Sequence, residues 1–152
     1  MKLKQIENCL SNEMMELLQG NSLVMLNAYD AEEGRVLSNA LSWVFATDES
    51  TIRFAVDHKS RLVKLAALNT EFVFTIIGLN KVYSIYGKSS IKKQLTEEMT
   101  LKMSIIEVDI DEIRDITFYG AEITQNPTFR KTYNEKLVKK LDDEVRNEIE
   151  SV

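Results

Sequence analysis

The stretch that decides the fold is IRFAVDHKSRLVKLAALN, residues 52–69. Its first residues are apolar and β-compatible, which predicts a buried strand. A short polar and cationic loop follows, and then a helix over residues 60–69 whose first turn carries Ser60, Arg61 and Lys64. Because the start of a helix has unpaired backbone N–H groups and partial positive charge, it attracts anions, and phosphate above all.

The cations at this helix start indicate more than a stable helix. With Ser60 as the cap, exposed Arg61 and Lys64 would oppose the helix dipole at a cost of about 0.3–1 kcal/mol each. Acidic residues would be expected there if stability alone were served. Together with Lys59 and the Ser60 hydroxyl, the two cations therefore predict a phosphate-binding cradle.

The composition, 44% hydrophobic and 28% charged, is that of an ordinary globular protein, and we expect a single domain over residues 1–152. A net charge of −5 argues against a binder of nucleic acid or of anionic membranes. Cys9 is the only cysteine, which excludes an internal disulfide and a cysteine-based metal site. The N-terminus lacks an apolar signal core, and no apolar run approaches the roughly 20 residues that span a bilayer, so we expect a cytoplasmic protein.

Apolar runs separated by short turns predict a chain made mainly of β-strands. The first three runs are joined by tight turns, which indicates an antiparallel meander. A parallel doubly wound fold is disfavoured because successive strands have no helix between them. Closing such a sheet into a barrel would remove its exposed edges. The predicted strands are 22–29, 35–46, 51–56, 71–78, 82–91, 103–110 and about 114–123.

Two further helices are predicted, one at each end of the chain. Apolar residues at helical spacing indicate a helix over 3–19, with Gly20 where a C-cap belongs. Asn126 and Pro127 are typical of a helix start, which predicts a helix over 127–150 appended to the barrel. The apolar stripe of this second helix is Phe129, Tyr133, Leu137, Leu141, Val145 and Ile149, and it could pack on its own barrel or on a partner.

Few residues point to catalytic chemistry. The five glycines are scattered, so there is no glycine-rich phosphate loop, and one His with one Cys cannot build a zinc site of familiar spacing. His58 is interpreted as a solvated loop residue, and no catalytic pair of carboxylates is indicated. Trp43 is interpreted as core packing, with a role in lining a cofactor left open.

The run FAVDHKSRLVKL, residues 54–65, resembles a known family when it is taken with its neighbours. It lies between a Trp-containing strand, Ser38–Phe45, and the strand FVFTI, residues 72–76, and a further strand ends in Gly87-Lys88. This order, with Ser-Arg and a following Leu after the third strand, is similar to the FMN-binding split barrels of the pyridoxamine 5′-phosphate oxidase-like family. The resemblance covers about residues 20–92.

The resemblance implies a fold and a cofactor. The fold would be an antiparallel split β-barrel of six to seven strands with three flanking helices: one at the N-terminus, a short one after the third strand and one at the C-terminus. The protein would be a homodimer with FMN in a cleft between the subunits, where it would meet a small-molecule substrate. The cofactor-binding residues implied are Leu41, Ser42, Trp43, Ala55, Val56, Asp57, Lys59, Ser60, Arg61 and Lys64.

The sequence also departs from the family. Pyridoxamine phosphate oxidases carry an Arg and a Lys in the second strand, and residues 38–43 of this chain offer neither. They also carry a Trp-Arg motif near the C-terminus, where this chain has no Trp. Vitamin B6 oxidase activity is therefore not expected. The expected function is an FMN-dependent oxidoreductase of unknown substrate, with no catalytic residue assigned. The alternatives are a carrier that binds flavin, F420 or haem without turnover, and a structural dimer with a vestigial pocket.

Overall fold

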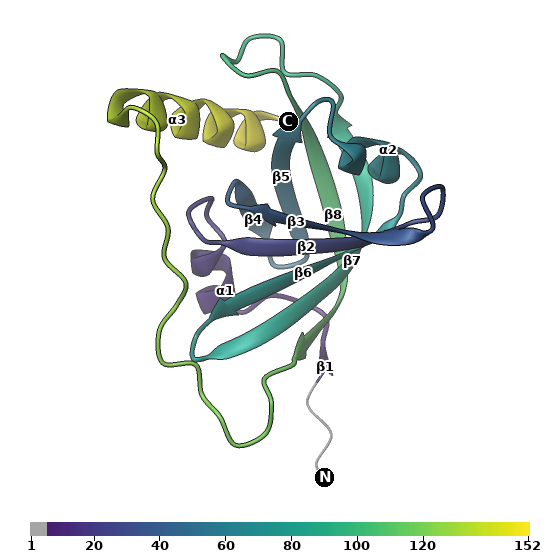
Figure 1. The fold of residues 1–152 in the computed structure, drawn as a ribbon, viewed down its shortest axis with the longest axis vertical. Helices are drawn as coiled ribbons and strands as arrows, with labels where there is room; N and C mark the ends of the chain where they lie inside the picture. Colours follow the sequence, from purple (N-terminus) through teal and green to yellow (C-terminus); the bar gives the residue numbers. More distant parts are fainter. Residues whose placement is uncertain (1–5) are drawn as a thin grey trace.

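A computed structural model describes residues 6–152, in which eight strands and three helices occur (Figure 1). All strand pairings are antiparallel, so the expected mainly β architecture with flanking helices is confirmed. The elements are β1 (Ile6–Glu7), α1 (Asn12–Leu17), β2 (Val24–Asp30), β3 (Arg35–Leu41), β4 (Val44–Asp48), β5 (Thr51–Asp57), α2 (Arg61–Ala67), β6 (Glu71–Gly78), β7 (Lys81–Lys93), β8 (Met103–Asp115) and α3 (Glu135–Ser151).

The strands form one curved sheet in the order β3-β2-β6-β7-β8-β5-β4, and β1 pairs with β8. The segment before β2 closes this sheet into a barrel by pairing with β4. The Gly20 N–H donates to the Val44 carbonyl at 3.0 Å, and the Ala46 N–H donates to the Leu18 carbonyl at 2.8 Å. The chain then runs directly into β2. This pairing thus links β4 to the segment that enters β2, while β3 remains the outer strand of its hairpin with β2.

The barrel interior is built from the alternate side chains of its central strands. Phe54 on β5 lies against Phe72 and Phe74 on β6, with ring centroids 6.0 and 5.7 Å apart. All three are fully buried, and each contributes about 1.5–3 kcal/mol of transfer free energy. Helix α2 covers this interior with Leu62 and Leu65. The buried strand predicted at 51–56 and the central strand predicted at 71–78 are both confirmed.

The strand predicted over 35–46 is wrong as a single element. It is divided at residues 42–43 into β3, which pairs with β2, and β4, which pairs with β5. These two strands lie at opposite ends of the strand order, so the three-strand meander is also wrong. An alternating pattern shows which face of a strand is buried. It does not show where a strand leaves one partner and joins another.

The predicted helix 3–19 is much shorter in the structure, and its first three residues lie outside the described part of the chain. Helix α1 starts after Ser11, whose hydroxyl oxygen accepts a hydrogen bond from the Met14 N–H at 3.2 Å. Before it, Ile6–Glu7 pair with β8 as a short strand. The cap at Ser11 starts the helix later than the spacing of the apolar residues predicted. The residues before it pair with β8 instead of continuing the helix.

Gly20 is not the helix cap that its position suggested. It belongs to the segment that pairs with β4. Its φ is +87°, a backbone conformation that residues with a side chain rarely adopt. A Cβ placed there would lie 2.2 Å from the ring of Phe45. Glycine is therefore required where the closing segment passes over this aromatic ring.

The C-terminal helix begins eight residues later than predicted, at Glu135 instead of 127. Its cap is Asn134, whose side-chain oxygen accepts from the Lys136 N–H at 2.8 Å, and Asn126 and Pro127 lie in irregular chain. Two Asn residues offered the same cap chemistry. The sequence pattern favoured the one next to proline.

The strand predicted over 114–123 is also wrong. Strand β8 ends at Asp115, and residues 116–134, called the strap below, have no regular secondary structure. The strap is held near its start by hydrogen bonds from the Ile116 N–H to Val82 O (2.9 Å) and from the Ile123 N–H to Asn80 O (2.8 Å). It then crosses the molecule to reach α3, as Figure 1 shows.

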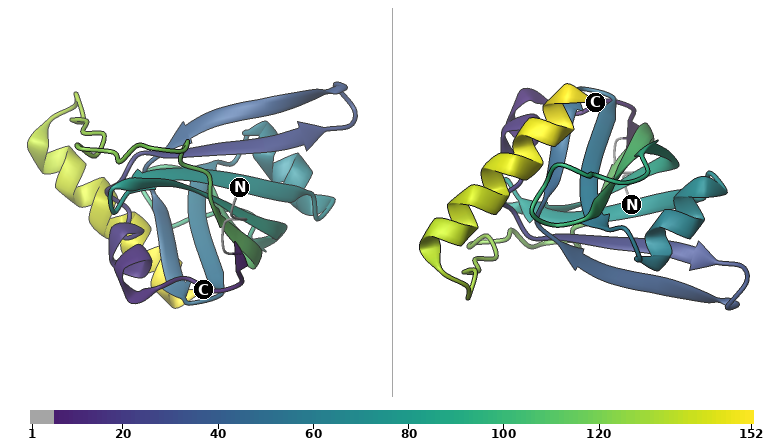
Figure 2. Two further views of the ribbon diagram at one scale, coloured as in Figure 1. Left: turned by 90° about the horizontal axis from the view of Figure 1, so that it is seen from below. Right: turned by 90° about the horizontal axis from the view of Figure 1, so that it is seen from above.

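Helix α3 packs on its own barrel, which decides between the two possibilities that the sequence left open. Leu141, Val145 and Ile149 are buried, and the last two join Phe45 and Ala55 in a second apolar cluster. The outer residues of the predicted stripe, Phe129, Tyr133 and Leu137, stay partly exposed. Helix α3 lies on one side of the barrel, and α2 lies with the tip of the β2–β3 hairpin on the other (Figures 1 and 2).

Within residues 6–152, no helix has both the length and the apolar character needed to cross a membrane.

Replacing Ile149 by Ala should lower the free energy of unfolding by about 2–4 kcal/mol, because a buried side chain is lost and a cavity remains. Leu137→Ala, on the same helix but at a site 38% exposed, should cost less than about 1 kcal/mol. Urea unfolding followed by circular dichroism measures both. Equal losses in the two variants would contradict the docking of α3 on the barrel.

Candidate functional site

The predicted phosphate cradle lies where β5 passes into α2. Ser60 caps the helix, since the Leu62 N–H donates to its Oγ at 3.2 Å. The preceding turn is fixed by Asp57, whose Oδ1 accepts from the Lys59 N–H at 2.8 Å and whose carbonyl accepts from the Ser60 N–H at 2.9 Å. The strand, loop and capped helix expected over residues 52–69 are therefore confirmed. The hydrogen bonds of Asp57 and Ser60 fix the backbone of the turn that carries the polar residues.

A cavity of about 460 Å³ opens beside this turn. It brings together the four residues of the predicted cradle, and its volume is in the usual range of ligand pockets. Because Ser60 Oγ already accepts one hydrogen bond, its hydroxyl hydrogen is available for an anion in the cavity. The cradle residues at the cavity are Lys59, Ser60, Arg61 and Lys64, with His58, Ile91 and Gln94 completing the wall.

Arg61 is held by acidic partners from the β2–β3 turn. Its Nε donates to Asp30 Oδ2, and its Nη2 lies 3.1 Å from Asp30 Oδ1 and 3.3 Å from Glu32 Oε2. Asp30 is 0% exposed, so its carboxylate needs this partner. Lys64 lies 3.8 Å from Glu32 and is otherwise open to solvent. Sequence reasoning missed this pairing, because Asp30 and Arg61 lie 31 positions apart, where spacing carries no signal.

The ion pair shifts the pKa of both groups. The Arg61 hydrogen bond, with help from the Glu32 and Glu33 N–H groups, lowers the pKa of Asp30 from 3.8 to about 2, against the effect of burial. The same hydrogen bond raises the pKa of Arg61 above its ordinary value. The charge of Arg61 is thus balanced inside the protein, and Arg61 ties α2 to the β2–β3 hairpin.

The other six predicted site residues do not line this cavity. Val56 points into the barrel core, while Ala55 lies in the second cluster beneath α3. Leu41 packs against the barrel core from β3, and Ser42 lies in the corner between β3 and β4. Asp57 has an exposed side chain, 3.6 Å from the His58 ring. The structure therefore brings together the residues predicted to bind the phosphate. It places the residues predicted to line the rest of the cofactor outside this cavity.

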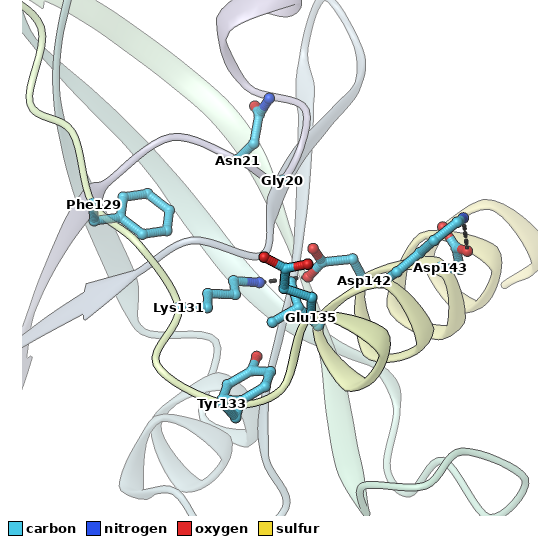
Figure 3. Close-up of a pocket in the computed structure, with 10 residues that line it drawn as sticks. Gly20, Asn21, Phe129, Lys131, Tyr133, Glu135, Asp142 and Asp143 are labelled. Carbon is cyan, nitrogen blue, oxygen red and sulfur yellow. Dashed lines mark hydrogen bonds and ion pairs between the residues drawn. The ribbon is translucent and has the colours of Figure 1, made fainter.

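Trp43, the sixth of these residues, is bound to α3 and to the strap. Its indole N–H donates to Asp142 Oδ1 at 2.8 Å. The Lys131 ammonium lies 4.6 Å from the centroid of its ring and pairs with the same carboxylate. Beside these residues is a second cavity, of about 530 Å³, shown in Figure 3.

Among residues 6–152, no cluster of three or more His, Cys, Asp or Glu side chains could hold a metal ion. His58 is a loop residue as interpreted from sequence. Its Nδ1 lies 3.0 Å from the Lys102 carbonyl, and its backbone N–H donates to the same carbonyl at 3.3 Å. This carbonyl orients the imidazole at the rim of the α2 cavity.

Comparison with known proteins gives a fold. No protein-family model matches the sequence, and no curated protein matches it. A solved pyridoxamine 5′-phosphate oxidase-like protein from Lactobacillus delbrueckii is similar with a TM-score of 0.59 at 14% identity, over 70% of this chain and 94% of that one. The chain has the split-barrel fold. The split barrel expected from the resemblance is confirmed.

Two other split barrels are similar. HupZ from Group A Streptococcus has a TM-score of 0.59 at 14% identity, over 74% of this chain and 98% of that chain. The general stress FMN/FAD binding protein of Xanthomonas citri has a TM-score of 0.52 at 11% identity, over 80% and 96%. Identities this low show a shared fold, and they transfer no residue role.

Asp30→Asn should be less stable than the wild type at pH 7, and the difference should shrink as the pH falls from about 4 to about 2. The pKa of Asp30 is about 2 in the folded state against 3.8 ordinarily, so its contribution is present above the ordinary value and is lost as pH falls through the folded one. Thermal unfolding at several pH values measures this.

The exposed carboxylate of Asp111 gives a matched control, because Asp111→Asn should show little difference from the wild type at any pH. A difference for Asp30→Asn that stays constant from pH 7 to pH 2 would show that the ion pair with Arg61 does not hold Asp30 ionised.

Proposed function

We propose that this chain is a flavin-binding split barrel that takes FMN with its phosphate in the cavity beside α2. The observation that carries the proposal is the convergence of Lys59, Lys64 and the Ser60 hydroxyl on one cavity of ligand size. Solved proteins of the same fold include one named as an FMN/FAD binding protein and one named as an F420 reductase, which supports a flavin-type cofactor.

The two lysines, and not Arg61, supply the free positive charge in this proposal. Arg61 already faces Asp30 and Glu32, whereas Lys64 has one distant carboxylate, at 3.8 Å. A phosphate would replace that weak contact with a charge-assisted hydrogen bond. Arg61 acts by holding α2 against the hairpin, so that the cavity keeps its shape.

We propose further that the protein is a homodimer whose partner completes the cofactor cleft. A third cavity, of about 360 Å³, lies between the β2–β3 turn and α2 and shares Arg61 and Lys64 with the first. Large exposed apolar side chains lie at its rim, among them Tyr29 and Leu68. An isoalloxazine ring is broad and flat with an apolar dimethylbenzene end, and a second subunit over this face would exclude water from it.

Bound FMN would supply electron or hydride transfer, and the residues of this chain would bind and orient it. We propose a flavin-dependent oxidoreductase acting on a small molecule in the cytoplasm. The described lining of the α2 cavity contains no Asp or Glu, and a second candidate is a flavin, F420 or haem carrier without turnover. Reduction of bound flavin by NAD(P)H, followed by reoxidation by an acceptor, would separate the two.

Lys59→Ala and Lys64→Ala should each weaken FMN binding about 10-fold or more, since a hydrogen bond to a charged group is worth about 1.5–3 kcal/mol. Quenching of flavin fluorescence measures the affinity. Riboflavin lacks the phosphate, so its affinity should be the same in the variants and in the wild type. F420 and haem are titrated in parallel by their absorbance.

Lys136→Ala, an exposed lysine on α3, is the control and should bind FMN like the wild type. Arg61→Ala is less diagnostic, because it also leaves the buried Asp30 without its partner. Failure of the wild type to bind FMN, F420 or haem saturably would exclude both candidate functions.

Light scattering on the purified protein should give twice the chain mass of 17.5 kDa. Replacing the exposed Leu68 by Glu should shift the equilibrium toward the monomer, since a charge would be buried in the interface. The exposed Tyr119, outside the α2 region, gives the control Tyr119→Glu. A wild-type monomer at all concentrations would contradict the dimer.

A further inference from the structure

The second cavity, of about 530 Å³, has no part in the proposed flavin site. It lies between the strap, the first turns of α3 and Asn21, and it shares no lining residue with the cavities beside α2 (Figure 3). Its volume is within the range of small-molecule sites. Its position on α3 places it on the other side of the barrel from the hairpin tip.

One side of this cavity already holds an ammonium group. Lys131, whose side chain is 16% exposed, places its Nζ 4.6 Å from the centroid of the Trp43 ring and pairs with Asp142. Asp142 also accepts the Trp43 indole N–H, which fixes the carboxylate against the ring. The electron-rich face of an indole and a carboxylate beside it are two groups that stabilise a cation, and here both already hold the Lys131 ammonium.

Two aromatic side chains of the strap form the walls. Phe129 and Tyr133 lie on either side of the Lys131 side chain and face the cavity in Figure 3. They are 44% and 38% exposed, so much of each ring is still open to solvent. A flat or apolar ligand between them would bury this surface, at about 25 cal/mol per Å² of apolar area.

The charges at the cavity leave a carboxylate in excess. Asp142 pairs with Lys131, and Asp143 pairs with Lys139 at 2.7 Å. Across residues 6–152, no ion pair or hydrogen bond of the Glu135 carboxylate occurs, and Figure 3 shows this side chain reaching toward Lys131 and Asp142. A ligand with a positive end would complete the charge balance.

We propose that this cavity binds small organic cations, in which an amine or quaternary ammonium group is attached to an aromatic or apolar body. The cationic end lies by Glu135 and Asp142, and the body lies between Phe129 and Tyr133. Anions of the same shape are repelled by the excess carboxylate. The site is independent of flavin binding.

Trp43 gives a direct readout, because it is the only tryptophan of the chain and its ring lies beneath Lys131. Titration with benzyltrimethylammonium should change its emission saturably, at constant ionic strength. Phenylacetate, an anion with a similar ring, should give no saturable change. The readout needs no flavin, so the result is unaffected if FMN does not bind.

Glu135→Gln should weaken binding of benzyltrimethylammonium about three- to fivefold, the effect of an exposed charge pair. Glu150→Gln, the same change at the far end of α3, should leave it unaltered. Phe129→Ala should also weaken binding, whereas Phe118→Ala, on an exposed part of the strap outside the cavity, should not.

Circular dichroism of each variant checks that α3 is kept. The proposal is overturned if the wild type gives no saturable change, if phenylacetate binds as well as the cation, or if the cavity variants bind like their controls.

Discussion

The corner between β3 and β4 is the constraint on which the rest of the structure depends. Two strands that follow each other in the chain must end on opposite edges of the sheet, and residues 42–43 carry the chain across. The segment 18–20 then closes the barrel by pairing with β4. Trp43, at this corner, packs against the second apolar cluster and not in the barrel core, and α3 and the strap bind it there. The change of partner thus places Trp43 where it can accept α3, through its hydrogen bond to Asp142.

The cations at and near the start of α2 do not all have the same role in the structure. Arg61 is explained within the chain, since it neutralises the buried Asp30 and joins α2 to the hairpin. A buried carboxylate without that partner would be strongly destabilising. Within residues 6–152, Lys59 and Lys64 have no comparable partner, apart from Glu32 at 3.8 Å from Lys64. The argument from the helix dipole no longer applies to Arg61, and it does not apply to Lys64 either, because Lys64 lies in the last turn of the seven-residue α2, where the dipole favours a cation.

Local chemistry could be predicted from the sequence, and contacts between distant residues could not. The strand before α2, the Ser60 cap and the central strand at 71–78 depend on neighbours along the chain, and all three are confirmed. The Asp30–Arg61 pair and the Trp43–Asp142 bond join residues 31 and 99 positions apart, where spacing gives no signal. The helix start at Asn134 was missed for another reason, because Asn126-Pro127 offers the same cap chemistry without the packing that decides between them.

The two halves of the second cavity differ in how firmly they are held. Helix α3 is fixed at its C-terminal end by Arg53, whose guanidinium donates to the Ile149 and Val152 carbonyls, a cation placed where the helix dipole favours one. Glu144 accepts from Thr100, and Arg146 donates to the Gln19 carbonyl, so polar contacts hold the helix on both sides of its apolar stripe. Trp43 and Asp142 are therefore preorganised. Phe129 and Tyr133 come from the strap, which lacks a hydrogen-bonded ladder, and local stability is lowest in such segments. A site whose carboxylate is held in place and whose aromatic side chains, Phe129 and Tyr133, can move suits small organic cations. These ligands share a cationic group and differ in their apolar bodies.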